Sequence, residues 1–397
     1  MKNMRIYADC AATAKMRKCA LDAYVATANE TFGNASSLYS EGQRAAELLF
    51  SCRRRIANVL NCSPNEIYFT AGGSEADNQA IASAIRAGAK KGKRKIITSA
   101  IEHHAVLHPL QRLQRDGYEV VFLPVSSDGI VSADDVKREL DDTVALVSVM
   151  TANNEIGTIQ PVEEIGALCR ERGVLFHTDA VQAVGHIPVS ADCCDYLAAS
   201  AHKFGGPKGT GFLFARKGAP LFPLVEGGAQ EKNKRAGTED VPAIAAATAA
   251  LEEAVEGMSE KNARILAMRE RLVDGLLSAL PHAALNGSRT QRLAGNANLC
   301  FEGCEGEALI LYLDDLGVAV SSGSACTSGS LEPSHVLLAI GRAHEVAHGS
   351  LRFSLDEHNT EEEIDRLLTL VPEVVNKVRS MSPVWRDLIS GKRKFIL

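Results

Sequence analysis

The sequence lacks several features that would point to particular classes of protein. It has no uninterrupted apolar run of about 18 residues, the length that a helix needs to cross a membrane, and no long basic run that would neutralise nucleic-acid phosphates. Its 43 basic and 49 acidic residues give a net charge of −6. Proline is scarce, at 13 residues, and the 46% hydrophobic content excludes a disordered or collagen-like chain. We therefore predict a globular protein without nucleic-acid or membrane partners.

The cysteines lack the spacing of common metal and redox motifs. The chain has 10 of them, but none forms a C-x-x-C pair, which excludes zinc-ribbon and thioredoxin-like sites. The N-terminal segment is charged from Lys2 onward and has no apolar stretch typical of a secretory signal. We therefore expect a cytoplasmic protein whose thiols are reduced and mostly packed as small hydrophobic side chains.

Short apolar runs alternate with helical patterns in the first half of the chain, which is typical of strands joined by crossover helices in a mostly parallel sheet. The predicted strands are 67–70, 96–99, 120–123, 144–149, 174–177, 196–200 and 211–215, and the predicted helices between them are 75–90, 105–115, 134–140 and 162–172. After a helix at 241–255, a second alternation ends in a terminal helix at 360–379. The pattern predicts an α/β fold with a boundary near residue 258.

Polar side chains follow several of the predicted strands, at the edge where open parallel sheets bind ligands. Residues 71–75, AGGSE, lead into a helix whose N-terminus could bind a phosphate, with Ser74 as a further donor. For this motif taken alone, a glycine turn with Ser74 as an N-cap is the favoured interpretation. His104 and His108 are four residues apart, but they lack the glutamate of the zinc-protease pattern, which disfavours a metal site.

The most informative segment is 200–209, SAHKFGGPKG. Lys203 directly follows a predicted strand and precedes a glycine–proline turn, where it could be desolvated and form a Schiff base. Pyridoxal phosphate requires such a lysine for its aldehyde, an anion cradle for its phosphate and an acid for its ring nitrogen. Residues 73–74 suit the cradle, Asp179 suits the acid, and His103 could lie on the face of the ring.

Several motifs together carry a specific resemblance. They are FGN at 32–34, ANNE at 152–155, HTDAVQ at 177–182, SAHKFGGPKG at 200–209, RAGTE at 235–239, SSGSACTSGSLEPSH at 321–335 and AHGSLRFS at 347–354. With them the chain resembles, nearly end to end, the cysteine desulfurases, which are fold-type I pyridoxal-phosphate enzymes of the class V aminotransferase superfamily. The similarity is greatest to the NifS-like branch, which supplies sulfur for iron–sulfur clusters.

The resemblance implies a domain organisation and roles for individual residues. It implies a large cofactor domain at 15–258 with a mostly parallel seven-stranded sheet, and a small α/β domain formed by 1–14 and 259–397. Lys203 would bind the cofactor aldehyde, His103 would stack on the ring, and Asp179 would pair with the ring nitrogen. The further cofactor contacts would be Gly73, Ser74, Asn154, Gln182, Ser200, His202 and, from the neighbouring subunit of a homodimer, Thr238. Asn34 and Arg352 would bind the substrate carboxylate.

Cys326 differs from the other cysteines in its surroundings. Serine and glycine flank it on both sides, so it is not part of an apolar pattern that would predict a buried thiol. Cys169, in contrast, lies in a periodic helical pattern. The resemblance implies that Cys326 takes sulfur from L-cysteine as a persulfide, leaving L-alanine. The acceptor would be an iron–sulfur scaffold protein of the NifU-like or IscU-like type. No resident metal is expected, and a role in cluster transfer would belong to Cys326.

Three other interpretations stay open at this point: a selenocysteine lyase, another class V enzyme such as a serine–glyoxylate aminotransferase, and a scaffold subunit of a cluster-assembly complex. Cys326 argues against the aminotransferase, which has no use for a nucleophilic thiol. The complete set of Lys203, Asp179 and His103 argues against a scaffold without catalysis.

Overall fold

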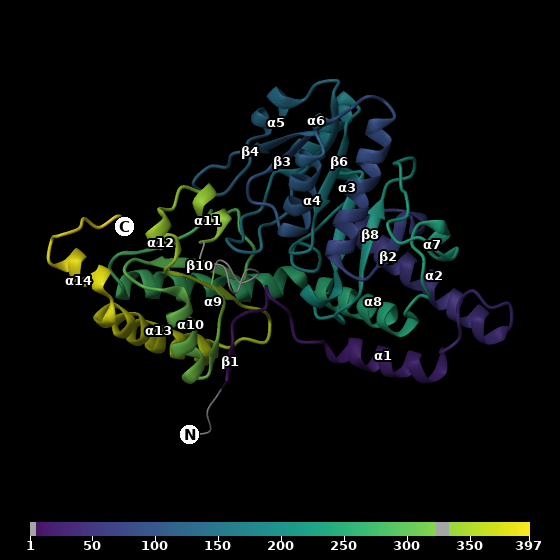
Figure 1. Ribbon diagram of the computed structural model, residues 1–397. Coiled ribbons are helices and arrows are strands. Elements are labelled where there is room, and N and C mark those ends of the chain that lie inside the picture. Colours follow the sequence, from purple (N-terminus) through teal and green to yellow (C-terminus); the bar gives the residue numbers. More distant parts are fainter. Residues whose placement is uncertain (1–4, 323–332) are drawn as a thin grey trace.

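The computed structural model describes residues 5–322 and 333–397, and its largest sheet has seven strands in the order β2-β8-β7-β6-β5-β3-β4 (Figure 1). The strands are β2 (Ile67–Thr70), β3 (Lys95–Ser99), β4 (Glu119–Leu123), β5 (Val144–Ser148), β6 (Leu175–Asp179), β7 (Tyr196–Ser200) and β8 (Gly211–Ala215). Only β8 runs antiparallel to its two neighbours in this sheet. The predicted mostly parallel seven-stranded sheet is confirmed.

Helices cover both faces of this sheet, because successive strand residues point to opposite sides. On one face, Ile96 and Leu146 pack in a core with α3 (Gly73–Ala89) and α4 (His104–Arg115). On the other, Ile97 and Val147 pack in a core with residues of five further helices. These are α1 (Lys18–Glu30), α2 (Ser40–Leu60), α5 (Ala133–Glu139), α6 (Val162–Arg172) and α8 (Val241–Val255). The four crossover helices predicted from the sequence are present, whereas α1 and α2 were not predicted.

A smaller antiparallel sheet contains β9 (Ala283–Leu285), β10 (Asn296–Phe301) and β12 (Ser350–Ser354). Beside it, β1 (Ile6–Tyr7) pairs in parallel with β11 (Val318–Ala319), so the start of the chain joins its C-terminal part (Figure 1). The helices of this region are α9 (Met258–Ala279), α10 (Gly306–Asp315), α11 (His335–Ala339), α12 (His344–Ala347), α13 (Glu361–Met381) and α14 (Pro383–Ile389). Its core includes Ile6 together with Leu299 and Phe353.

Two details differ from the sequence prediction. The helix predicted to end the fold is α13, but Ser382 caps a further helix, α14, in which Pro383 occupies the first position. Within the irregular stretch after β8, a short helix α7 (Gln230–Asn233) contains left-handed backbone at Glu231 and Lys232. Across 5–322 and 333–397, we find no helix with both the length and the apolar composition to cross a membrane.

Candidate active site

The carboxyl ends of the central strands open onto one cavity of about 300 Å³. The predicted site residues that line it are Gly73, Ser74, His103, Asn154, Asp179, Gln182, Ser200, His202, Lys203 and Arg352. All but Arg352 come from the larger region, and Arg352 lies on β12 of the smaller sheet. The fold therefore gathers into one space residues that lie up to 279 positions apart in the chain, from Gly73 to Arg352.

Lys203 lies in the turn Ala201–Lys203 that directly follows β7. Its Nζ donates to the carbonyl oxygens of Ala11 (2.7 Å) and Ala12 (2.9 Å), so the amine reaches across to the N-terminal segment. The main-chain carbonyl of Lys203 lies 3.0 Å from His186 Nε2, which helps to fix the turn. The lysine is thus held by its backbone while its amine is directed toward the cavity.

The N-terminus of α3 forms a cradle at one end of the cavity. The helix begins at Gly73, and Gly72 is its N-cap without a side-chain hydrogen bond, so the interpretation of Ser74 as an N-cap is wrong. A Cβ on Gly73 would lie 2.4 Å from Val181 Cγ2, so a side chain there would crowd the cradle. Helix N–H groups with the hydroxyls of Ser74 and Ser200 suit a phosphate.

Asp179 and His103 face the cavity from β6 and from the start of α4. Asp179 is 4% exposed, and its Oδ1 accepts the Val181 N–H (2.9 Å). Burial raises the pKa of this carboxyl against the opposing effect of His103. The Nδ1 of His103 accepts the Ala105 N–H (3.1 Å) as the cap of α4, so Nε2 carries the proton of the neutral ring. Burial lowers the pKa of His103 and favours that neutral form.

Arg352 is the main cation at the side of the smaller sheet. Its Nη2 pairs with Asp9 Oδ1 (2.7 Å) and its Nη1 donates to the Asn154 carbonyl (2.9 Å). Its Nε is buried and has no hydrogen-bond partner within the described part of the chain. A buried guanidinium with an unused donor in a cavity wall suits a carboxylate ligand.

Three predicted residues are not among those that line the cavity. Asn34 is exposed, and its Oδ1 accepts the Ser36 N–H (2.9 Å). Thr238 is exposed on the segment before α8. Cys326 lies outside the described residues, between Ser322 and Pro333. The other nine cysteines are free thiols.

The sequence analysis missed one polar residue of the cavity wall, Asp77. It lies four residues after Gly73 on α3, one turn further along the same helix face. That spacing is the sequence signal that could have identified it.

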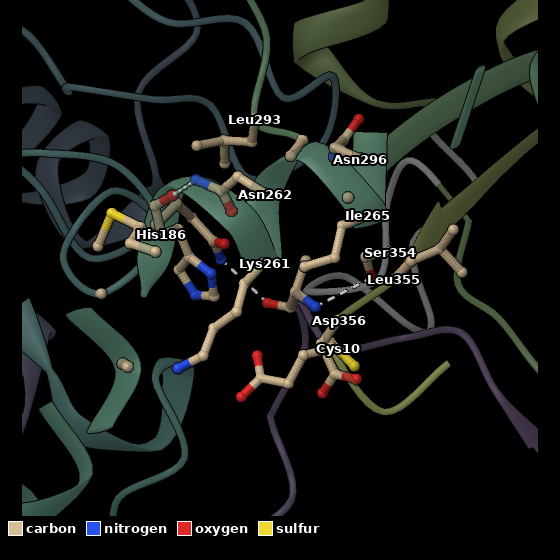
Figure 2. Close-up of a pocket in the computed structure, with 18 residues that line it drawn as sticks. Cys10, His186, Lys261, Asn262, Ile265, Leu293, Asn296, Ser354, Leu355 and Asp356 are labelled. Atoms are coloured by element: carbon tan, nitrogen blue, oxygen red, sulfur yellow. Dashed lines mark hydrogen bonds between the residues drawn. The ribbon is translucent and has the colours of Figure 1, made fainter. Parts of the chain in front are cut away.

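A second, smaller cavity of about 50 Å³ adjoins the first, and Figure 2 shows residues that line it. Ala11 and Gln182 line both cavities, and the hydrogen bond from Gln182 Nε2 to the Ala11 carbonyl (3.0 Å) lies between them. Cys10 lines the second cavity beside Asp356, and burial together with this carboxylate raises the pKa of its thiol. A thiol of raised pKa is a poor nucleophile, so we assign no chemistry to Cys10.

Comparison with known proteins agrees with the fold. The model of the family "Aminotransferase class-V" matches residues 6–367. The cysteine desulfurase IscS of Methanosarcina thermophila is 49% identical over 385 residues, covering 96% of this chain and 95% of that protein. IscS of Clostridium botulinum (strain Kyoto / Type A2) is 47% identical over 396 residues, covering 99% and 100%. A solved NifS-like protein aligns with a TM-score of 0.88 at 37% identity, covering 94% of this chain and all of that one.

The parallel sheet with a lysine, an aspartate and a histidine at its strand ends defines a pyridoxal-phosphate enzyme of the aminotransferase class-V type. Within that family, the identity and coverage of these relatives show that the chain belongs to the cysteine desulfurases.

Proposed function

We propose that this chain converts L-cysteine into L-alanine and transfers the sulfur to Cys326 as a persulfide, which supplies sulfur for iron–sulfur cluster assembly. The observation that carries the proposal is the single cavity that Lys203, Asp179, His103 and Arg352 share. The full-length similarity to cysteine desulfurases supports the same reaction. Bound pyridoxal phosphate supplies an electron sink that makes the substrate Cα–H acidic.

Different residues of the cavity would have different roles in this reaction. Lys203 would bind the cofactor and move the proton at the substrate Cα. Asp179 would hold a proton at the ring nitrogen, and Gln182 and Asn154 would orient the ring. Gly73, Ser74, Ser200 and His202 would hold the phosphate. Arg352, with Asn34, would orient the substrate carboxylate.

The sulfur-transfer step would use a thiolate at Cys326. Its sulfur attacks the substrate sulfur, so that an S–S bond forms as the substrate Cβ–S bond breaks. Overall, cysteine and the thiol give alanine and the persulfide, and no external oxidant is needed. His103, neutral with a proton on Nε2, is suited to exchange protons with the two thiols.

The described residues on either side of 323–332 bond to groups at or next to this cavity. Ser321 donates its backbone N–H to the Arg352 carbonyl (3.2 Å) and accepts the Arg352 N–H (2.7 Å). On the other side, Ser334 Oγ donates to the buried carboxylate of Glu155, and His335 Nε2 lies 3.0 Å from the Glu102 carbonyl. One flank therefore bonds to Arg352, which lines the cavity, and the other bonds to the chain neighbours of Asn154 and His103, which also line it.

Incubation with sulfur-labelled cysteine, followed by peptide mapping, tests substrate, reaction and residue together. We expect label on the Cys326 peptide and formation of alanine. Cys326→Ala should keep the cofactor absorbance but lose both the label and the release of sulfide. Cys193→Ala, which removes another thiol that is not fully buried, is the control and should behave like the wild type. Full activity in Cys326→Ala would contradict the assignment, and selenocysteine in place of cysteine tests the lyase alternative.

A homodimer with shared active sites is part of the proposal. Thr238 is exposed outside the cavity of its own chain and would reach the phosphate bound by the partner. Large apolar side chains next to Asn34 are strongly exposed: Phe32 (72%), Leu38 (90%) and Tyr39 (62%). A second copy that covers this segment would bury them and could bring Asn34 to a substrate site.

We also retain three broader expectations as proposals. The first is a sulfur acceptor of the NifU-like or IscU-like scaffold type. The second is a cytoplasmic location, which the free thiols of the nine described cysteines support. The third is the division into 15–258 and 1–14 with 259–397, which the pairing of β1 with β11 and the separate core around Phe353 support.

A further inference from the structure

A buried pair of polar side chains lies in the wall of the cavity beside Asp179. Asp77 on α3 and His177 on β6 are 1% and 0% exposed, and Asp77 Oδ1 lies 3.3 Å from His177 Nε2. Neither atom forms a hydrogen bond of good geometry in the described residues, either with the other or with a third group. The 3.3 Å contact is therefore an ion-pair contact and not a hydrogen bond of good geometry, and leaving two such atoms buried is costly.

Ser148 on β5 completes this arrangement. Its Oγ lies 2.8 Å from His177 Nδ1. Burial lowers the pKa of His177 to about 3, so the ring is neutral and carries one proton. If Nδ1 accepts from the Ser148 hydroxyl, the proton of the neutral ring lies on Nε2, the atom that faces the Asp77 carboxylate at 3.3 Å. A donor aimed at a carboxylate favours its ionised form.

Asp77 also belongs to the group of acids around Asp179. His177 and Asp179 are two residues apart on β6 and so point to the same face of the sheet, the face toward Asp77. Both Asp77 and Asp179 line the main cavity. Burial, Asp179 and Glu102 raise the pKa of Asp77 in the protein without its cofactor. A cation placed there reverses this effect and favours the ionised carboxylates.

We propose that Asp77, held by His177 and Ser148, is a positioning residue that adds a second negative charge behind Asp179 and so keeps the bound cofactor protonated. The inference rests on the proposed function, since it requires pyridoxal phosphate in this cavity. Asp77 thereby adds to the charge that Asp179 supplies by itself. The groups that face Asp77 are His177 and Asp179 on β6, Glu102 after β3 and, around the cavity, His103, His202, Lys203 and Arg352.

The test is a pH titration of the visible absorbance of the bound cofactor in the complete holoenzyme. Asp77→Asn keeps the shape of the side chain but removes its charge, so the cationic form of the cofactor–lysine linkage loses stabilisation. We expect its transition to fall by about one pH unit, a tenfold change in proton affinity. Glu102, whose pKa is raised to about 8, also acts on Asp77. Because Glu102 is unchanged in every variant compared, its own titration does not contribute to the differences between them.

Two further pairs of variants separate this role from a structural one. His177→Gln keeps an N–H donor toward Asp77 and should titrate like the wild type, whereas His177→Leu should lower the transition as Asp77→Asn does. Asp195→Asn is the matched control. Asp195 directly precedes β7, at the end of the strand away from the cavity, and its Oδ2 accepts the Phe176 N–H (2.9 Å). It should leave the transition unchanged even where it lowers the melting temperature.

The outcomes are distinguishable. A wild-type titration in Asp77→Asn, or equal behaviour of His177→Gln and His177→Leu, overturns the inference while leaving the proposed function intact. Absence of a visible cofactor band in the wild-type protein overturns the proposed function itself. The assignment is supported if the transition is lowered in Asp77→Asn and His177→Leu but not in His177→Gln or Asp195→Asn.

Discussion

At the scale of the residue, Arg352 shows how one side chain is prepared for a ligand. Its Nη atoms are engaged by Asp9 Oδ1 at 2.7 Å and the Asn154 carbonyl at 2.9 Å, while its Nε points to no described partner. A guanidinium can meet these two groups and a substrate carboxylate together, because its five N–H donors lie in one fixed plane. A lysine ammonium keeps the charge but loses this geometry.

We therefore expect Arg352→Lys to raise the KM for cysteine by about tenfold or more, the loss of one charge-assisted hydrogen bond. Because the reacting atoms are held by other residues, kcat should fall less than KM rises. Steady-state kinetics with cysteine measure both quantities. A variant with an unchanged KM would show that Arg352 does not contact the substrate.

Glu102 gives a prediction about pH at the same scale. It is fully buried, and burial raises its pKa to about 8 although Ser99 Oγ and the Met150 N–H hydrogen-bond to it. Between the ordinary pKa of a glutamate and pH 8, the folded protein holds a proton that the unfolded chain has lost. The free energy of unfolding should therefore fall as pH rises through this range, by up to about 1.4 kcal/mol per pH unit for one such group.

Glu102→Gln removes this contribution, because an amide does not titrate. Denaturant unfolding of the cofactor-free protein at a series of pH values between about 5 and 8 should show a shallower decline in the variant. Glu155, whose pKa burial raises to about 7, should preserve part of the decline. Equal slopes in the two proteins would contradict the raised pKa of Glu102.

At the scale of the element, the strands of the large sheet were predictable because each is a short apolar run bounded by turn residues. The first two helices were not. The α1 helix buries only Ala20 and Thr27, so it lacks a periodic apolar stripe. The α2 helix has such a stripe, but three successive arginines interrupt it, and one of them, Arg53, is buried against Glu231. That partner lies 178 residues away in the chain.

The residues of the candidate site likewise divide into those that a local sequence pattern predicts and those that it does not. Residues that directly follow strands, such as Lys203 and Asp179, were found because the edge of a parallel sheet gathers them whatever the details of packing. The contact of Asp9 with Arg352 joins residues 343 positions apart, and no local pattern encodes it. Cofactor roles for Asn154 and Gln182 came only from the family resemblance.

The start of α3 carries a prediction that belongs to the element. A Cβ at position 73 would lie 2.4 Å from Val181 Cγ2, so Gly73→Ala must displace the helix start or Val181. We expect cofactor affinity to fall by about tenfold or more, because the helix N–H groups would no longer converge on the phosphate. Absorbance titration of the cofactor-free protein with pyridoxal phosphate measures the loss.

Ala82→Gly is the control for helix stability, since Ala82 is exposed in the interior of α3. It should destabilise the helix by roughly 1 kcal/mol without changing cofactor affinity. If both variants lose affinity equally, the cradle at Gly73 has no specific role.

At the scale of the whole molecule, the cavity of one chain brings together every predicted cofactor contact except Thr238. That residue is exposed on the segment before α8, and the apolar side chains near Asn34 are exposed as well. Both features are explained if a second copy of the chain covers them. We therefore expect a molecular mass twice that of the 42.4 kDa chain in sedimentation equilibrium.

Complementation between one inactive dimer and one with weakened cofactor binding tests whether Thr238 acts across the interface. Lys203→Ala should be inactive, and Thr238→Ala should need about tenfold more pyridoxal phosphate, the loss of a hydrogen bond to a charged group. If Thr238 serves the partner's site, a mixed dimer combines Lys203 of one chain with Thr238 of the other and so contains one complete site. At limiting cofactor, unfolding and refolding the two variants together should restore activity above either parent. If Thr238 serves its own chain, every mixed site carries a defect and no activity returns, because exchange of subunits cannot then unite the two intact residues.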